Sequence, residues 1–316
     1  MKSALKLGRV AALRVGQLLA TMLVVSFLVH LALEANADSV AVKVLGQYST
    51  VDQRQAWLVA HDYNDAFLVR YGRWVAGFVQ GDWGQSSHYQ ESIAALMRPR
   101  LAASALLAGV ALAITLPLSL ALGVIAGTRP GGWTDRLVSA FAIVSTSIPD
   151  YAMAAFLVAV FVLGLGWLPG VSTMADGVSL RELVLPVAVL VLASTGYLAR
   201  ITRTSMIEAM AAPHIRMARL KGASPRRIIA HHALRNALLT PVTVIGLQIP
   251  WMISGVIIIE VFFAYRGFGT LIYQAALNSD IYLIEACAMV SVVVVVASQL
   301  VGDVLQRWID PRLRRE

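Results

Sequence analysis

Long, nearly uninterrupted runs of apolar residues restrict the fold of this chain more than any other feature. Six of these runs hold between 17 and 31 residues, and an α-helix needs about 20 to cross a bilayer. They cover residues 15–33, 101–127, 137–167, 183–199, 238–263 and 284–305. Only 14% of the residues are charged, against about 25% in soluble domains. The sequence therefore predicts an all-α integral membrane protein with six transmembrane helices.

Basic residues are distributed unevenly between the two sides that six spans would define. If the N-terminus is inside, the inside segments 1–14, 128–136, 200–236 and 306–316 hold 18 of the 26 lysines and arginines. An excess of these residues marks the cytoplasmic side of a membrane protein. We therefore expect both termini to be cytoplasmic. The net charge of +8 then reflects membrane topology, and nucleic acid is not expected as a partner.

The beginning of the chain allows two interpretations. Four basic residues precede the first apolar run, and Ala35-Asn-Ala37 after it resembles a signal-peptidase site. The run is long for the apolar part of a signal peptide, and further spans follow, so an uncleaved first helix is favoured. Cleavage after Ala37 stays an open alternative.

Three regions follow from these runs. Residues 1–33 form a cytoplasmic N-terminus with the first helix, 34–100 an extracytoplasmic region, and 101–316 a core domain that holds the other five apolar runs and a long basic loop at 200–236. Aromatic residues recur at roughly helical spacing in the second region. Because such residues favour the membrane–water boundary, we expect amphipathic helices there. A small packed subdomain is the alternative.

The most basic stretch of the chain begins at Pro213 and carries turn signals at regular points. Proline suits the first position of a helix, because its missing N–H would be unsatisfied there in any case. Gly222 can close that helix in a left-handed conformation, and Ser224 before Pro225 is typical of the start of a second one. The pattern predicts two short helices that bend at Gly222. An ordinary basic loop that only sets topology is the alternative.

The same stretch resembles the cytoplasmic loop motif of ABC importer permeases, in the variant of the dipeptide/oligopeptide/nickel family. The similarity rests on Ile215-Arg-Met-Ala-Arg-Leu-Lys-Gly222 and His232-Ala-Leu-Arg-Asn236. Gly81-Asp-Trp-Gly-Gln-Ser86 and Asp310-Pro-Arg-Leu-Arg314 resemble further marks of that family. The resemblance implies the type I ABC importer permease architecture with a cytoplasmic coupling helix.

The resemblance also implies a function and a set of partners. The chain would be a permease subunit of an ATP-driven, binding-protein-dependent importer in the bacterial cytoplasmic membrane, for peptides or similar small solutes. Nickel chelates or another small solute are alternative substrates. Expected partners are a second related permease, two cytoplasmic ATP-binding subunits, an extracytoplasmic binding protein and membrane lipid. The residues expected to contact an ATPase are Arg216, Ala218, Arg219, Lys221, Gly222, Ala223 and Leu234.

No catalytic or cofactor motif accompanies this pattern. A phosphate-binding loop needs Gly-Lys followed by Ser or Thr, and no lysine of the sequence follows a glycine. We therefore expect no enzyme activity and no cofactor in this chain, with ATP and magnesium held by separate ATPases. The histidine spacing indicates no metal site.

Two carboxylates lie within or beside apolar runs, where a charge costs about 3 kcal/mol or more. Asp150 is interpreted as a residue of the substrate pathway, or as a residue at the cytoplasmic interface. Glu260 is a second pathway candidate, although a pair with Arg266 that braces a turn is the simpler interpretation. In a different class of function, an ion-gradient-driven secondary transporter, Asp150 would relay the ion.

Overall fold

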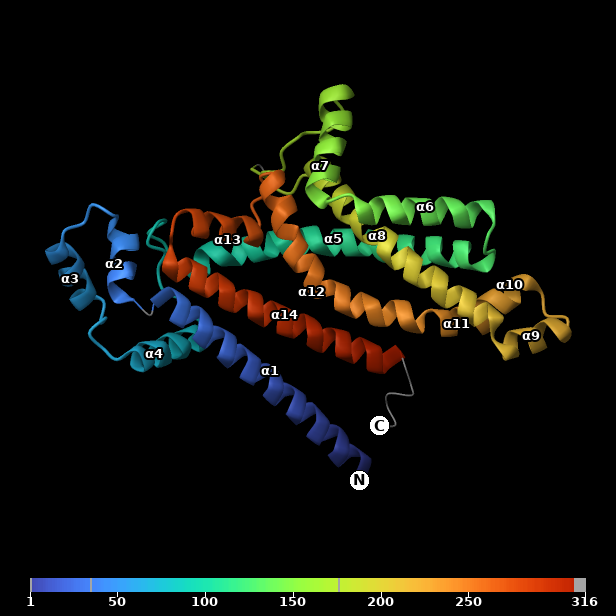
Figure 1. The fold of residues 1–316 in the computed structure, drawn as a ribbon, viewed down its shortest axis with the longest axis horizontal. Coiled ribbons are helices and arrows are strands. Elements are labelled where there is room, and N and C mark those ends of the chain that lie inside the picture. Colours follow the sequence, from blue (N-terminus) through green and yellow to red (C-terminus); the bar gives the residue numbers. More distant parts are fainter. Residues whose placement is uncertain (1, 35, 176, 310–316) are drawn as a thin grey trace. The chain divides into compact units, whose positions relative to one another are not determined.

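The computed structural model describes residues 2–34, 36–175 and 177–309, and these residues form helices with no extended strand among them (Figure 1). The N-terminal helices are α1 (Lys2–Glu34), α2 (Ala37–Leu45), α3 (Val51–Ala60), α4 (Phe67–Gln80), α5 (Ile93–Thr128), α6 (Trp133–Ser147), α7 (Asp150–Val158) and the π-helix η1 (Ala159–Gly164). The C-terminal ones are α8 (Leu180–Ala211), α9 (Pro213–Leu220), α10 (Pro225–Arg227), the π-helix η2 (Ile228–Ala233), α11 (Leu234–Ala237), α12 (Leu239–Phe262), α13 (Phe268–Leu277) and α14 (Ile281–Ile309). The predicted all-α class is confirmed.

Four of these helices are long and apolar enough to cross a membrane: α1, α5, α8 and α14. A fifth span results if α6 and the α7–η1 segment are counted together, but the two halves meet at an angle of 104°. The predicted run 137–167 is therefore not one straight helix. Pro149 explains the break, because a proline disfavours helical geometry in the residue before it, and Ile148 is extended. The count of six spans stays a prediction.

The chain folds into two compact units. Unit 1 comprises residues 1–101 and 271–297, and unit 2 comprises residues 102–270 and 298–316. In unit 1, Val40, Tyr63 and Ile281 form a small buried core, so the beginning of α14 packs with helices from the first hundred residues. The long extracytoplasmic region predicted at 34–100 is helical over α2, α3 and α4.

Asp280 fixes the beginning of α14 within unit 1. Its buried carboxylate accepts hydrogen bonds from the backbone N–H groups of Ser87 at 3.3 Å, His88 at 3.2 Å and Leu283 at 3.2 Å, and from the Ser86 hydroxyl. An aspartate at this position satisfies free N–H groups at the helix start and suits the positive end of its dipole. The carboxylate thus joins the loop at 86–88 to α14.

Helix α8 is the centre of unit 2. Its residues Leu183, Val187 and Leu190 belong to one buried apolar cluster that also contains residues of α5, α7 and α12. In Figure 1, α8 passes beside α6, with which it shares a long contact. Glycines permit the closest approaches: a Cβ at Gly123 of α5 would lie 2.6 Å from the Ala199 carbonyl oxygen of α8. Small residues of this kind let helix backbones pack closely in membrane proteins.

We expect the variant Gly123→Ala to weaken unit 2, because its new methyl group cannot fit against the α8 backbone. Overpacking of this kind costs about 1–3 kcal/mol of unfolding free energy. Gly109→Ala on the same helix is the matched control, since a Cβ there meets no atom within 4 Å. Thermal unfolding in detergent should show a lower midpoint for Gly123→Ala alone. Equal midpoints for the two variants would contradict the close contact.

Candidate coupling site

The basic segment 213–236 begins directly at the end of α8. A single residue, Ala212, separates α8 from α9 and has extended backbone angles. Pro213 imposes this break, because the residue before a proline avoids the helical region. Pro213 itself occupies the first turn of α9, as predicted. The two helices therefore follow each other with a break of a single residue.

Gly222 closes α9 in a left-handed conformation with a φ of +79°, also as predicted. The N–H of Gly222 bonds to the Arg219 carbonyl at 3.0 Å, and the N–H of Ala223 bonds to the Ala218 carbonyl at 3.1 Å. These two bonds satisfy the last free carbonyls of α9. A Cβ at Gly222 would meet no atom within 4 Å, so only its backbone conformation restricts this position within the chain.

The second predicted helix differs from the expectation. Ser224 has extended angles at the N-cap position, but its side chain makes no cap hydrogen bond. The predicted start of this helix, with Ser224 at the N-cap position and Pro225 in the first turn, is nevertheless confirmed. The α-helical part ends after Arg227, and a π-helical turn over 228–233 leads into α11, which contains Leu234. π-helical turns are rare and frequently occur at functional sites.

One face of the segment packs onto the end of α8. Ile215, Ile228 and Ala233 are buried with Met206 and Ala209 of α8. Ala218 and Ala223, two of the predicted contact residues, are partly buried against this cluster. Their small side chains therefore allow α9 and the turn after it to pack closely against the rest of the same chain. The cluster makes the segment and the end of α8 one packed body.

The opposite face is exposed and combines charge with apolar surface. Its exposed residues include the predicted contact residues Arg216, Arg219, Lys221 and Gly222. Met217 and Leu220 lie among them with 53% and 78% of their surface exposed. Exposed methionine and leucine side chains within a basic surface are typical of an interaction site. Covering such apolar groups with a partner removes them from water, which is favourable.

A buried ion pair, which sequence analysis missed, supports α8 just before this segment. Asp135 of α6 binds the Arg203 guanidinium through both oxygens, one contact measuring 2.8 Å. The Asp135 carboxylate also accepts from the backbone N–H of Gly131 at 2.7 Å and from the Ser139 hydroxyl at 3.3 Å. Of the two side chains in this pair, Asp135 is fully buried at 3% exposed, and Arg203 is partly exposed. The pair ties the beginning of α6 to the part of α8 that precedes Met206.

The two carboxylates predicted for a substrate pathway lie in different settings. Asp150 is the first residue of α7, at the corner of the bent helix pair, and is partly exposed. Glu260 is fully buried near the end of α12, where it accepts hydrogen bonds from the Ser104 hydroxyl and from the Thr270 N–H at 3.0 Å. Arg266, its predicted partner, is exposed. A pathway role for either carboxylate stays a prediction.

The turn after α12 is organised around Glu260. The Ser104 hydroxyl accepts from the Phe268 N–H at 2.7 Å, and the Tyr265 hydroxyl donates to the Ala103 carbonyl at 2.7 Å. Burial, with the nearby Glu260 carboxylate, raises the pKa of Tyr265 to about 12, so the phenol keeps the proton that it donates. These contacts join the turn after α12 to Ala103 and Ser104 of α5.

Comparison with known proteins identifies the relatives of this chain. Residues 119–315 match the family described as binding-protein-dependent transport system inner membrane component. The oligopeptide transport system permease protein AppB of Bacillus subtilis is 32% identical over 297 residues, covering 92% of this chain and 93% of that protein. OppB of Salmonella typhimurium is 34% identical over 252 residues, covering 79% and 82%.

A solved structure of the MetNI methionine ABC transporter in inward-facing conformations shares the fold. It superposes with a TM-score of 0.51 and 20% identity, covering 66% of this chain and 92% of that chain. The fold and the comparisons define a multi-pass transport permease of the ABC importer type. The chain belongs to the family of binding-protein-dependent transport system inner membrane components. Permeases of this family are transport subunits, not enzymes, and work with ATPase and substrate-binding partners.

Loss of the Asp135–Arg203 pair should destabilise unit 2 markedly. Asp135→Asn leaves the partly exposed Arg203 guanidinium without its charged partner, and losing hydrogen bonds to a charged group costs about 1.5–3 kcal/mol. Arg73→Gln is the control, because it removes an exposed pair with Asp65 and should change stability little. Thermal unfolding midpoints check both. A midpoint for Asp135→Asn equal to that of the unaltered protein would rule out a bracing role.

Proposed function

We propose that the chain is one of two permease subunits of an ATP-driven importer for peptides or chemically similar small solutes. The exposed basic and apolar face of α9, packed rigidly on α8, is the observation that carries the coupling part of this proposal. The names of AppB and OppB, both oligopeptide transport permeases, support the substrate class. A substrate-binding protein outside the membrane delivers the solute, and both termini of this chain lie in the cytoplasm.

The outer face of α9 enters a groove of a cytoplasmic ATPase. Met217 and Leu220 supply the apolar contact, and Arg216, Arg219 and Lys221 pair with acidic residues of the groove. Gly222 lies at the end of this face, where a larger side chain would hold the ATPase away. Ala218, Ala223 and Leu234 contribute by holding α9 and the turn after it in place.

ATP drives transport through the packed body at the end of α8. Two ATPase subunits bind ATP and magnesium, and this chain binds neither of them. When they close, α9 moves with them, and α8 transmits the movement to α6, α7 and α12, with which it is in contact. Rigid-body movement of packed helices is a common form of such switching. The bent pair α6 and α7–η1 then changes position beside the solute pathway.

Asp150 is the side chain of this proposal that meets the solute. It lies at the corner of the bent pair, is partly exposed, and would attract the ammonium group of a peptide. Asp150→Asn should lower the importer's apparent affinity for peptides with a free N-terminus more than its apparent affinity for N-acetylated peptides. Uptake of radiolabelled peptides in proteoliposomes that contain the whole importer measures this. Equal losses for both kinds of peptide would remove Asp150 from the pathway.

Gly222→Arg should leave the subunit in the membrane with its second permease but abolish ATP-dependent uptake. Gly222→Ala is the matched control, because it introduces the same backbone strain at a φ of +79° without the bulk. Affinity purification of the C-terminally tagged chain, with mass spectrometry of its partners, should recover P-loop ATPases with the alanine variant and lose them with the arginine variant.

Two results would contradict the proposal. Normal ATP-dependent uptake by Gly222→Arg would remove α9 from coupling. Recovery of the unaltered chain without any ATPase, while it still transports under an ion gradient, would make it a secondary transporter.

A further inference from the structure

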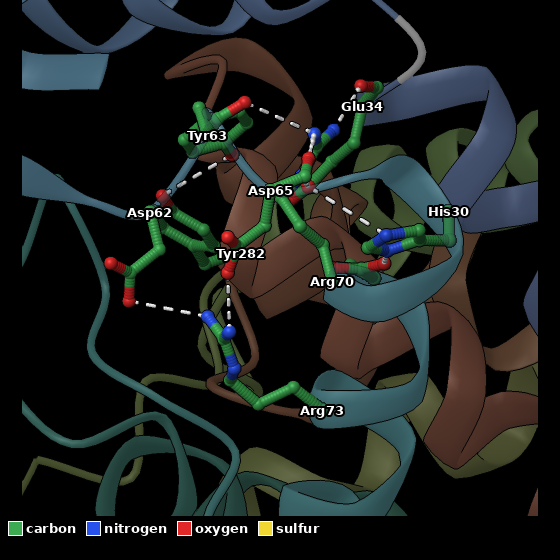
Figure 2. A network of polar contacts seen from close by, with 9 residues as sticks. His30, Glu34, Asp62, Tyr63, Asp65, Arg70, Arg73 and Tyr282 are labelled. Carbon is green, nitrogen blue, oxygen red and sulfur yellow. Dashed lines mark hydrogen bonds and ion pairs between the residues drawn. The ribbon is translucent and has the colours of Figure 1, made fainter. Parts of the chain in front are cut away.

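A buried group of one imidazole and two carboxylates lies inside unit 1 and takes no part in the proposed coupling (Figure 2). His30 and Glu34 are one turn apart at the end of α1, and Glu285 lies near the start of α14. Their exposed fractions are 2%, 5% and 0%. One ligand atom from each of the three residues lies within 4.8 Å of the other two. We call these three residues the His–Glu–Glu cluster.

The surroundings hold this cluster in a fixed position. The ring of His30 packs against the rings of Phe67, Tyr71 and Trp74 of α4, with centroid separations of 5.1, 5.4 and 5.8 Å. Arg70 donates to the backbone carbonyls of Glu34 at 3.0 Å and Asp65 at 3.1 Å. Its guanidinium therefore fixes the end of α1 through the backbone, while its Nε stays 3.7 Å from the Glu34 carboxylate.

Both ring nitrogens of His30 face a carboxylate. Nδ1 contacts Glu285 Oε1, and Nε2 lies 3.7 Å from Glu34 Oε2. A neutral imidazole has only one N–H, so one ring nitrogen presents a lone pair toward a negatively charged oxygen. With neutral His30, the three residues and Arg70 carry a net charge of −1. Either an additional proton or a bound cation would balance this charge in a buried site.

Two buried atoms of the cluster have no hydrogen-bond partner, and they indicate which cation fits. These atoms are His30 Nε2 and Glu285 Oε2. A proton on the imidazole would balance the charge, but it would leave Nε2 too far from Glu34 for a hydrogen bond and Oε2 without a donor. Buried polar atoms without partners cost about 1–3 kcal/mol each. A single metal ion bound by the His30 ring and by both carboxylates would act as a partner for these buried atoms.

We propose that the His–Glu–Glu cluster binds a divalent transition-metal ion, with Zn²⁺ the best match. One imidazole nitrogen and two carboxylate oxygens are zinc ligands, and three protein ligands leave a fourth position for water. A cavity of about 260 Å³, lined by His30, Glu34 and Tyr282 among others, has room for that water. Calcium and magnesium fit less well, because they prefer sets of oxygen ligands.

The bound ion would join α1 to α14 across 255 residues of sequence. Metal occupancy would then set how firmly the last helix is held to the first within unit 1.

Zinc binding by the full-length chain in nanodiscs tests this site, with an affinity tag that contains no histidine. After chelation and dialysis, titration with Zn²⁺ should give one ion per chain. His30→Gln and Glu285→Gln should each weaken binding by more than about 100-fold, since even outer-shell partners account for 10- to 100-fold. His88→Gln is the control, because His88 is an exposed histidine of the same unit. It should bind zinc like the unaltered chain.

Two further measurements separate a metal site from an ion pair. Co²⁺ added to the unaltered chain should give the visible absorption band of a low-coordinate site, and the band should be lost in His30→Gln. Glu285→His replaces one ligand type by another, so it should retain zinc binding, although it destroys a histidine–carboxylate pair. Absence of the cobalt band from the unaltered, folded chain would overturn the proposal. So would zinc affinity unchanged by His30→Gln, or lost equally in His88→Gln.

Discussion

The close contact of α8 with its neighbours is the interaction on which unit 2 depends. Lipid tails are as apolar as the side chains, so there is little hydrophobic driving force for helices to associate within a membrane. The helices associate instead through close packing and a few polar contacts. Gly123 provides such packing on one side of α8, and the Asp135–Arg203 pair provides a polar contact on another. Together these contacts hold α8 to α5 on one side and to α6 on another.

The position of α9 follows from this arrangement. Proline and glycine determine where it begins and ends, and the cluster around Ile215 determines which face it buries. What remains outside is a surface with cations around Met217 and Leu220. A short helix would not be stable alone in water, and its packing on α8 supplies the stability that its length cannot.

Local signals allowed the all-α class and the bounds of α9 to be predicted, because apolar run length, Pro213 and Gly222 act within a few residues. The break at Ile148 could be placed only in the structure, although Pro149 is its cause. The partners of Asp135, Glu260 and Glu285 were beyond prediction, since each partner lies many residues away. The proximity of His30 to Glu285 likewise could not be read from histidine spacing, because spacing describes neighbours in sequence and not in space.

The division of unit 1 between the two ends of the chain has a consequence for biosynthesis. A ribosome makes α1 well before residues 271–297, so α1 is synthesised before its partner in unit 1 exists. During that interval His30 and Glu34 have no Glu285, and the loop at 86–88 has no Asp280 to bind. Unit 1 can therefore be completed only after synthesis has passed residue 285, and until then the two side chains of α1 and the loop remain without their partners.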